Sequence, residues 1–177
     1  MRGAIDGCSL LVSTPDTVST LAHYTSPELI VPELRARGTA AVIGELCTAM
    51  QREGRLEDPL AFSKAVMSHE LRCSTAMPPG WALPHARVKG LTRLSFALGR
   101  SPVDLDWLEQ GGLGVRMVFL FAVPDPDNGA YMSLLAALAK LGLNPTCLAR
   151  LLQAPDRWAM LELLRQAPLP QTKPTMA

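Results

Sequence analysis

Two segments in the first half of the chain carry the hydrophobic spacing of amphipathic helices. The first covers residues 39–52, where apolar side chains recur at i, i+3, i+4 and i+7, and Gly54 follows as a stop. The second is predicted to begin behind Asp58, a capping residue, with Pro59 at the first helical position, and to end near Cys73. The apolar faces are predicted to comprise Ile43, Leu46, Cys47 and Met50 in the first helix, and Phe62, Ala65, Val66 and Leu71 in the second.

The middle of the chain alternates short apolar runs with turn residues, a pattern typical of strands. A short buried or edge strand is predicted within residues 26–32, between two prolines. The Met-Pro-Pro-Gly sequence at residues 77–80 predicts a turn, followed by an extended piece at 81–83. Three further strands are predicted over residues 94–98, 103–107 and 115–123, the last being nearly continuous in apolar residues.

The second half of the chain returns to helical spacing. After a polar turn at residues 125–129, a third helix is predicted over 131–141, with Leu134, Leu135, Leu138 and Leu141 facing inward. Asn144 and Pro145 predict the start of a short fourth helix, and a fifth is predicted from near Pro155 to Arg165. Two helices, a run of strands and three helices predict an α/β sandwich with a central mixed β-sheet and helices on both faces.

Length and local composition predict how the chain is organised. Its 177 residues fit one domain with a real hydrophobic core. Residues 1–24 are rich in Ser and Thr without a sustained period, so we expect an N-terminal extension there. We expect the globular domain over residues 25–167 and a flexible tail over 168–177, which carries three prolines.

Charge and apolar length exclude several classes of function. Seventeen basic and sixteen acidic residues give a net charge of +1, and no Lys/Arg cluster supplies the electrostatic footprint of a nucleic-acid-binding protein. Runs such as 117–123 are far shorter than the roughly 20 residues of a membrane span. The four cysteines form no C-x-x-C pair, which indicates reduced thiols in helices and hence a cytoplasmic protein.

Motifs for common cofactors and catalytic sites are also absent from the sequence. Neither a G-x-G-x-x-G nor a Walker-type sequence occurs, so no nucleotide site is indicated. His23, His69 and His85 form no H-x-x-x-H pair, and Glu70 is adjacent to His69 and so faces another side of the helix, which argues against a metal site. No G-x-S-x-G elbow marks a hydrolase. Trp81 and Trp107 are interpreted as packing residues.

The histidine in the sequence Trp-Ala-Leu-Pro-His-Ala-Arg, residues 81–87, has an unusual setting. Pro84 has a fixed φ, and Arg87, two residues after His85, carries a charge suited to an oxyanion or a phosphate. These features suit a nucleophilic histidine. On local grounds alone, however, the favoured interpretation of His85 is a structural histidine bonded to a backbone carbonyl.

A wider set of residues gives His85 a family context. The segment from His69 to His85, with two helices before it and strands after it, resembles the EIIA proteins of the bacterial phosphoenolpyruvate-dependent phosphotransferase system, in their mannitol/fructose and nitrogen-regulatory class. The resemblance extends from about residue 27 to 166. The residues in register with the family signature are Glu70, Ser74, Thr75, Gly80, Ala82, Leu83, Pro84 and His85.

This resemblance implies a function and a partner. It implies that His85 accepts a phosphoryl group from a phosphohistidine carrier protein, similar to HPr, and that no cofactor takes part. Backbone N–H groups of the turn ending at Gly80, the hydroxyls of Ser74 and Thr75, and the Arg87 cation are then candidate groups that stabilise the phosphoryl oxygens. Local capping of a helix or turn is an equal alternative for Ser74 and Thr75.

Two positions depart from the family pattern. His69 stands where the family has an active-site arginine, and Tyr131 stands where it has a second active-site histidine. Histidine is only partly cationic near neutral pH, and tyrosine cannot become a cation. Pro78 and Pro79 also remove N–H donors from the turn. The resemblance as a whole implies a phosphocarrier of the nitrogen-regulatory type, and these substitutions motivate the alternative, a regulatory binding module with weak or no phosphotransfer.

Overall fold

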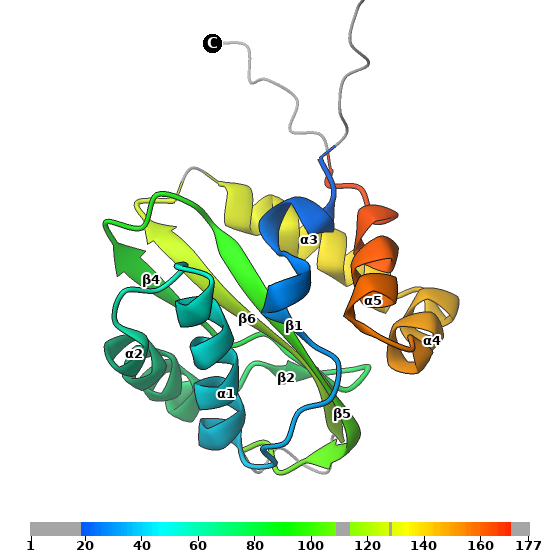
Figure 1. The fold of residues 1–177 in the computed structure, drawn as a ribbon, viewed down its shortest axis with the longest axis horizontal. Helices are drawn as coiled ribbons and strands as arrows, with labels where there is room; N and C mark the ends of the chain where they lie inside the picture. The colour runs from blue at the N-terminus through cyan, green and yellow to red at the C-terminus, as the bar shows by residue number, and fades with distance from the viewer. Residues whose placement is uncertain (1–18, 109–113, 128, 171–177) are drawn as a thin grey trace, which may run out of the picture.

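The computed structural model describes residues 19–108, 114–127 and 129–170, which form a mixed sheet between two layers of helices (Figure 1). The strands are β1 (Ile30–Val31), β2 (Ala76–Met77), β3 (Trp81–Ala82), β4 (His85–Lys89), β5 (Ser95–Leu105) and β6 (Val115–Asp125). The helices are α1 (Thr39–Arg52), α2 (Pro59–Arg72), α3 (Ala130–Gly142), α4 (Pro145–Gln153) and α5 (Arg157–Arg165), with short 3-10 helices η1 (Leu21–Tyr24) and η2 (Pro27–Leu29). The predicted α/β sandwich with a mixed sheet is confirmed.

The sheet is built around the long antiparallel pair of β5 and β6. On one side β1 runs parallel to β5. On the other side β3 and β4 both run parallel to β6, one after the other, and β2 pairs antiparallel with β3. β3 and β4 therefore lie one after the other beside β6, with a break at Leu83 and Pro84, and β4 forms the edge of the sheet there.

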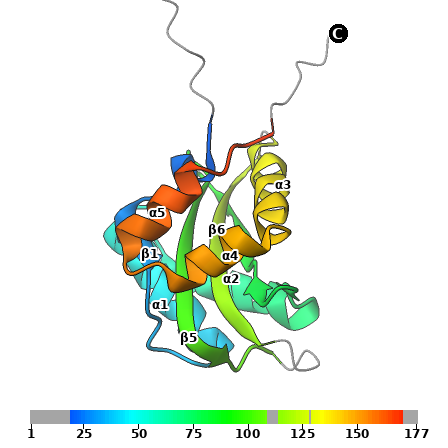
Figure 2. The ribbon, with the colours of Figure 1, turned by 90° about the vertical axis from the view of Figure 1, so that its right-hand side faces the viewer.

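The two faces of the sheet bury side chains of different size. Phe96, Phe119 and Phe121 belong to the core beneath α3, α4 and α5, whereas Ala97 and Ala122 belong to the core beneath α1 and α2. Figure 2 shows α3, α4 and α5 in front of β5 and β6, with α1 and α2 behind. This alternation explains the nearly continuous apolar run in β6, since both of its faces are covered.

The first two helices have the predicted ends, but one predicted face is wrong. The Asp58 side chain caps α2 by accepting a hydrogen bond from the Ala61 N–H, as predicted. Leu71 was expected to face inward and is 68% exposed, and Ala65 is exposed as well. The buried residues of α2 are instead Phe62, Val66 and Glu70, spaced four residues apart. The buried face of α2 is thus a single row of residues at every fourth position. Leu71, one position after Glu70, lies on a neighbouring side of the helix and projects into solvent.

The two strands predicted over residues 94–98 and 103–107 are a single long strand, β5, and the separate strands are a wrong prediction. A register shift against β6 lies between Arg100 and Leu105. Pro102 lacks an N–H for ladder pairing, and such residues sit at bulges or edges without ending a strand. The irregularity therefore accommodates the proline that makes the sequence look interrupted.

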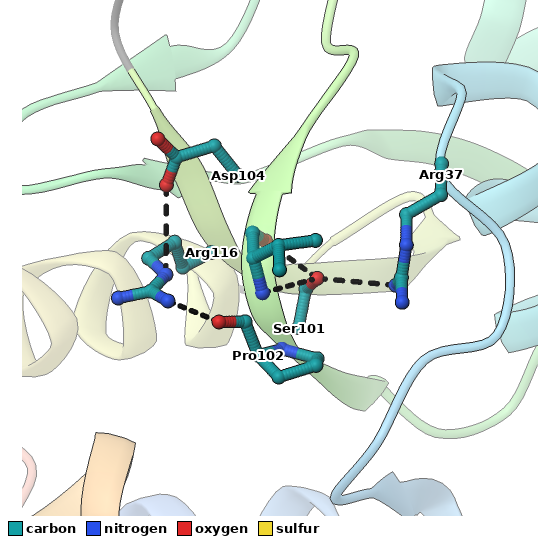
Figure 3. Close-up of polar contacts among 6 residues, drawn as sticks. Arg37, Ser101, Pro102, Asp104 and Arg116 are labelled. Atoms are coloured by element: carbon teal, nitrogen blue, oxygen red, sulfur yellow. Dashed lines mark hydrogen bonds and ion pairs between the residues drawn. The ribbon is translucent and has the colours of Figure 1, made fainter.

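Polar side chains hold this irregular part of β5 in place (Figure 3). The Ser101 hydroxyl donates to the Val103 carbonyl at 2.6 Å and accepts from Arg37 Nη1 at 3.3 Å. Arg116 of β6 pairs with Asp104, with Nε 3.5 Å from Oδ1, and donates to the Pro102 carbonyl. The bulged backbone thus keeps hydrogen-bond partners where the regular ladder is lost.

The three later helices follow the prediction closely. The Asn144 side chain caps α4 by accepting from the N–H groups of Thr146 and Cys147. α5 begins at Arg157, two residues after the predicted Pro155, because Asp156 caps it. Cys47 and Cys147 lie in helices as free thiols, and Cys73 is also free, whereas Cys8 lies outside the described residues.

The two ends of the described chain lie together. The Leu21 N–H donates to the Ala167 carbonyl at 3.0 Å, and Thr20 forms an isolated antiparallel β-bridge with Pro168. The Leu21 side chain is fully buried. The predicted domain boundaries at residues 24 and 167 stay a prediction.

Among the described residues no single helix is long and apolar enough to cross a membrane. The one pair of helices that meets the length and composition criteria together, α3 with α4, is bent by 92°.

Candidate functional site

His85 begins β4 at the interruption of the sheet edge. The extended piece predicted from the sequence ends at residue 83, and the structure makes His85 the first residue of the next strand, at the edge of the sheet. The Pro84 carbonyl accepts from the Phe121 N–H of β6 at 3.0 Å, which fixes the chain just before the histidine. No described strand pairs with the outer edge of β4. The half-buried imidazole therefore lies at an edge that another molecule can approach.

One hydrogen bond defines the state of the His85 imidazole. Its Nδ1 lies 3.1 Å from the Leu83 carbonyl oxygen. A carbonyl can only accept, so in the neutral ring the proton resides on Nδ1 and the lone pair on Nε2. Local geometry thus leaves Nε2 as the nucleophilic atom.

His69 and Tyr131 flank His85 from different helices. The His69 ring of α2 has its centroid 4.5 Å from that of His85, and the Tyr131 ring of α3 lies 5.4 Å away. Tyr131 also packs edge-on against Phe121 at 5.5 Å. The structure therefore brings together the three residues that the sequence analysis singled out, although they come from two helices and one strand.

Burial keeps both His85 and Tyr131 uncharged. Desolvation lowers the pKa of His85, and the charges of His69 and Arg87 act in the same direction, against the Leu83 carbonyl and Glu70, which raise it. Desolvation raises the pKa of Tyr131 to about 12, with Arg87 opposing it and Asp127 adding to it. At neutral pH the site thus contains a neutral imidazole and a phenol that keeps its proton.

Two groups near His85 have unused hydrogen-bonding capacity. The Nδ1 atom of His69 is buried and has no hydrogen-bond partner among the described residues. Arg87 is exposed on β4 and forms no hydrogen bond or ion pair within the described part of the chain, although its charge acts on both His85 and Tyr131. Arg87 can therefore bind an additional anionic group, whereas the Nδ1 of His69 is enclosed by the protein.

Ser74 and Thr75 direct their hydroxyls to Glu70, a carboxylate that is only 1% exposed. Glu70 Oε1 accepts from the Ser74 hydroxyl at 3.2 Å and from the Thr75 N–H at 2.7 Å, and Oε2 accepts from the Thr75 hydroxyl at 2.9 Å. Trp107 donates its Nε1–H to Oε1 at 2.8 Å. Direct contact of Ser74 and Thr75 with a phosphoryl group stays a prediction.

Sequence reasoning missed this arrangement of Glu70 and Trp107. Trp107 was interpreted as packing and is indeed buried, but its indole N–H also has a polar partner. The available signal was the four-residue spacing of Glu70 from Val66 and Phe62, which places a carboxylate on the apolar face of α2. Such a group is stable only with hydrogen-bond donors around it.

Gly80 shapes the turn in front of β3. Its φ is +96°, and a Cβ atom there would lie 2.6 Å from the Gly114 carbonyl oxygen, so only glycine fits. The Gly80 N–H donates to the Met77 carbonyl at 3.0 Å, and the Gly80 carbonyl accepts from the Arg116 N–H at 2.8 Å. Gly80 thus closes the turn, and a direct role toward a phosphoryl group stays a prediction.

No group of three or more His, Cys, Asp or Glu residues within the described ranges is arranged to hold a metal ion. The side chains at this site provide a nucleophilic nitrogen, a phenol O–H, a second imidazole and an exposed guanidinium. Such a set can receive an electrophilic centre at His85 and bind negative oxygens around it.

Comparison with known proteins identifies relatives with single and multiple domains. The chain is 28% identical over 125 residues to the PTS system fructose-specific EIIABC component of Bacillus subtilis (strain 168), covering 71% of this chain but only 20% of that protein. It is 24% identical over 148 residues to a nitrogen regulatory protein of Bradyrhizobium diazoefficiens, covering 84% of this chain and 96% of the relative.

The fold is similar to that of the nitrogen regulatory protein IIA-Ntr from Neisseria meningitidis, with a TM-score of 0.67 and 21% identity, over 81% of this chain and 98% of that structure. The sequence matches the family described as "Phosphoenolpyruvate-dependent sugar phosphotransferase system, EIIA 2" over residues 23–167. This match covers most of the chain, including every residue of the site around His85. The chain therefore belongs to the EIIA 2 family of the phosphoenolpyruvate-dependent sugar phosphotransferase system.

Proposed function

We propose that this protein is a phosphohistidine carrier of the nitrogen-regulatory type, with His85 as the phosphoryl acceptor. The observation that carries the proposal is the His85 imidazole, whose Nδ1 is bonded to the Leu83 carbonyl so that Nε2 is free at an open sheet edge. The nitrogen-regulatory type is supported by the Bradyrhizobium relative, which aligns over nearly its whole length.

The proposed reaction is a transfer of a phosphoryl group between two imidazoles. The Nε2 lone pair of His85 attacks phosphorus in line, the new N–P bond forms, and the N–P bond to the donor histidine breaks. Throughout the transfer the proton stays on Nδ1 of His85, which donates it in a hydrogen bond to the Leu83 carbonyl. Proton and charge are thereby balanced without a separate general base.

Several groups are available for the phosphoryl oxygens. Arg87 provides a permanent cation, and Tyr131 provides an O–H that stays protonated because its pKa is about 12. His69 is a further candidate, because its ring lies beside that of His85. Ser74, Thr75 and Gly80 are further candidates from the turn region. In this scheme the oxygens are bound mainly from the two helices and from β4.

The partner in this proposal is a small phosphohistidine carrier protein similar to HPr. Its phosphohistidine must reach Nε2 of His85, and the open edge of β4 is the side from which no described strand blocks the approach. We expect the encounter to take place in the cytoplasm.

Labelling with radioactive phosphoenolpyruvate tests the proposal. Purified protein is incubated with the first enzyme of the phosphotransferase system and its carrier, and acid-labile label on the protein is measured. We expect label on the wild type and none on His85→Ala. His23→Ala is the matched control, because His23 is exposed and distant in the sequence, and it should label normally. A labelled His85→Ala protein would exclude the assigned acceptor.

A regulatory binding module without phosphotransfer is the second candidate. The observation that favours it is the pair His69 and Tyr131, which replace the arginine and the histidine expected from the family pattern. Tyr131 adds no positive charge to the site. Absence of label on the wild type, under conditions in which another EIIA protein is labelled, would favour this module over the carrier.

A further inference from the structure

The carboxylate of Glu70 is buried and is balanced entirely by neutral donors. It accepts from the backbone and hydroxyl of Thr75, from the Ser74 hydroxyl and from the Trp107 indole, and it forms no ion pair with a described residue. Each of these groups directs a hydrogen at Glu70, so both carboxylate oxygens act as acceptors. Glu70 therefore dictates the direction of the hydrogen bonds around it.

Because of this bond to Glu70, the Thr75 hydroxyl oxygen acts as an acceptor for the backbone close to His85. Its single hydroxyl proton is donated to Glu70, at 2.9 Å from Oε2, so its oxygen lone pairs are left to accept. The Leu83 N–H donates to this oxygen at 3.1 Å. The position of the Leu83 peptide is thus set by a side chain eight residues earlier.

The residue Leu83 in turn orients the histidine. Its carbonyl accepts from His85 Nδ1 at 3.1 Å. Pro84, between them, has a fixed φ, and its carbonyl is bonded to the Phe121 N–H at 3.0 Å. Because Leu83 precedes a proline, its own backbone is restricted to extended conformations, so anchoring its N–H also restricts its carbonyl. That carbonyl accepts from Nδ1 and thereby favours one tautomer of His85.

For the phosphoryl transfer proposed above, on which this role rests, we propose that Thr75 and Glu70 are positioning residues that hold His85 with its proton on Nδ1 and its lone pair on Nε2. Trp107 belongs to the same network, because its indole N–H fixes the Glu70 carboxylate from the loop after β5. None of the three needs to touch the phosphoryl group. Their effect is on the fraction of His85 that is ready to react.

The variant Thr75→Val tests this role, because it keeps the shape of the side chain and removes the acceptor for the Leu83 N–H. We expect the maximal labelling rate to fall about tenfold with little change in the KM for the carrier, since the carrier's docking is unaffected. Nitrogen NMR of the histidine ring in the unphosphorylated protein should show that the Nε2–H tautomer of His85 gains population.

Further variants serve as a rescue, a control and a fallback for this test. Thr75→Ser keeps the hydroxyl and should restore both the rate and the tautomer. Thr48→Val is the matched control, because the Thr48 hydroxyl bonds only to the Gly44 carbonyl on the exposed side of α1, and it should change neither readout. If Thr75→Val does not fold, Trp107→Phe tests the same network from its other end and should shift the tautomer in the same direction.

A folded Thr75→Val protein with the wild-type tautomer and the wild-type rate would overturn the positioning role. The tautomer measurement needs no phosphoryl transfer, so it decides this role even if the wild type takes no label. In that case the proposed function fails while the hydrogen-bond network is still tested.

Discussion

At the scale of single residues, the protonation of His85 sets the pH range in which it can react. Burial lowers the pKa of its imidazole, and only the neutral ring has a free Nε2. An ordinary histidine becomes half protonated at about pH 6.5. His85 should stay neutral below that pH, so we expect the labelling rate to hold until the pH falls below about 6.5 and to decline only at lower values.

Proton NMR of the His85 ring gives the pKa directly, and labelling at saturating carrier gives the rate profile. Because the folded pKa is depressed, protonation also opposes folding, so the contribution of His85 to stability is full above about pH 6.5 and is lost as the pH falls toward the folded pKa. A rate that declines with its midpoint at or above the ordinary histidine pKa would contradict this assignment.

The residue at position 69 decides how much fixed positive charge lies beside His85. The centroid of the His69 ring is 4.5 Å from that of His85, so a side chain at this position lies beside the imidazole that we propose as the phosphoryl acceptor. Arginine is always cationic and binds oxygens through a planar fork. We expect His69→Arg to increase the labelling rate several-fold, about 3- to 10-fold if one additional charged hydrogen bond forms in the transition state.

The control for this substitution is His23→Arg, which adds the same charge at an exposed position. It should leave the rate within about twofold of the wild type, since exposed charges are strongly screened. An unchanged or lower rate in His69→Arg would show that a missing cation does not limit the transfer.

At the scale of elements, Arg100 of β5 joins the sheet to α4. Its Nη1 donates to the carbonyls of Leu151, Leu152 and Ala154, at 3.1, 3.1 and 2.6 Å, and its Nε donates to the Pro32 carbonyl at 2.9 Å. The last carbonyls of a helix have no partner within the helix, so this guanidinium satisfies the C-terminal end of α4. One side chain thus fixes where α4 ends.

Replacing Arg100 by Met should destabilise the protein by about 3 kcal/mol, because several carbonyls lose a charged donor at once. The control is Arg165→Met on α5, which breaks a surface pair with Glu162 whose partners are 56% and 57% exposed. Such an i, i+3 pair contributes about 0.2–0.5 kcal/mol. Chemical denaturation of both variants measures the difference, and equal losses would contradict the role given to Arg100.

The elements that could be predicted from the sequence are those with local causes. The ends of α1, α2 and α4 follow from spacing and from capping residues such as Asp58 and Asn144, all within a few positions of the helix they start. β4 depends on pairing with β6, which is distant from it in sequence, and the continuation of β5 past Pro102 depends on resuming its pairing with β6 at Leu105 and Val115. Local pattern carries no information on such pairing.

The candidate site also has features that could be predicted from the sequence and features that could not. The grouping of His85, His69 and Tyr131 was expected from the family resemblance and agrees with the ring distances. The bond between Trp107 and Glu70 joins residues 37 positions apart and could not be inferred from either neighbourhood. Hydrogen bonds across such separations depend on the packed fold, so only the structure reveals them.

At the scale of the whole molecule, the segment before residue 25 closes the fold. Leu21 is fully buried in the core shared by α3, α4 and α5, and its N–H is bonded to Ala167 at the other end of the domain. The sequence predicted an extension that ends at residue 24, because the stretch before it shows no hydrophobic period. A single buried leucine in a 3-10 helix leaves no such period, yet it can contribute as much as a core position.

Leu21→Ala tests whether this segment is part of the cooperative unit. Truncating a buried leucine costs about 2–5 kcal/mol, and the loss should appear as a lower midpoint of denaturant unfolding with an unchanged slope. Leu143→Ala is the control, since Leu143 is 84% exposed, and it should cost less than about 0.5 kcal/mol. If both variants unfold like the wild type, η1 is dispensable and the domain begins at residue 25. If Leu21→Ala alone is destabilised, the contacts between the two chain ends stabilise the fold, and the cooperative folding unit includes residues 20 and 21.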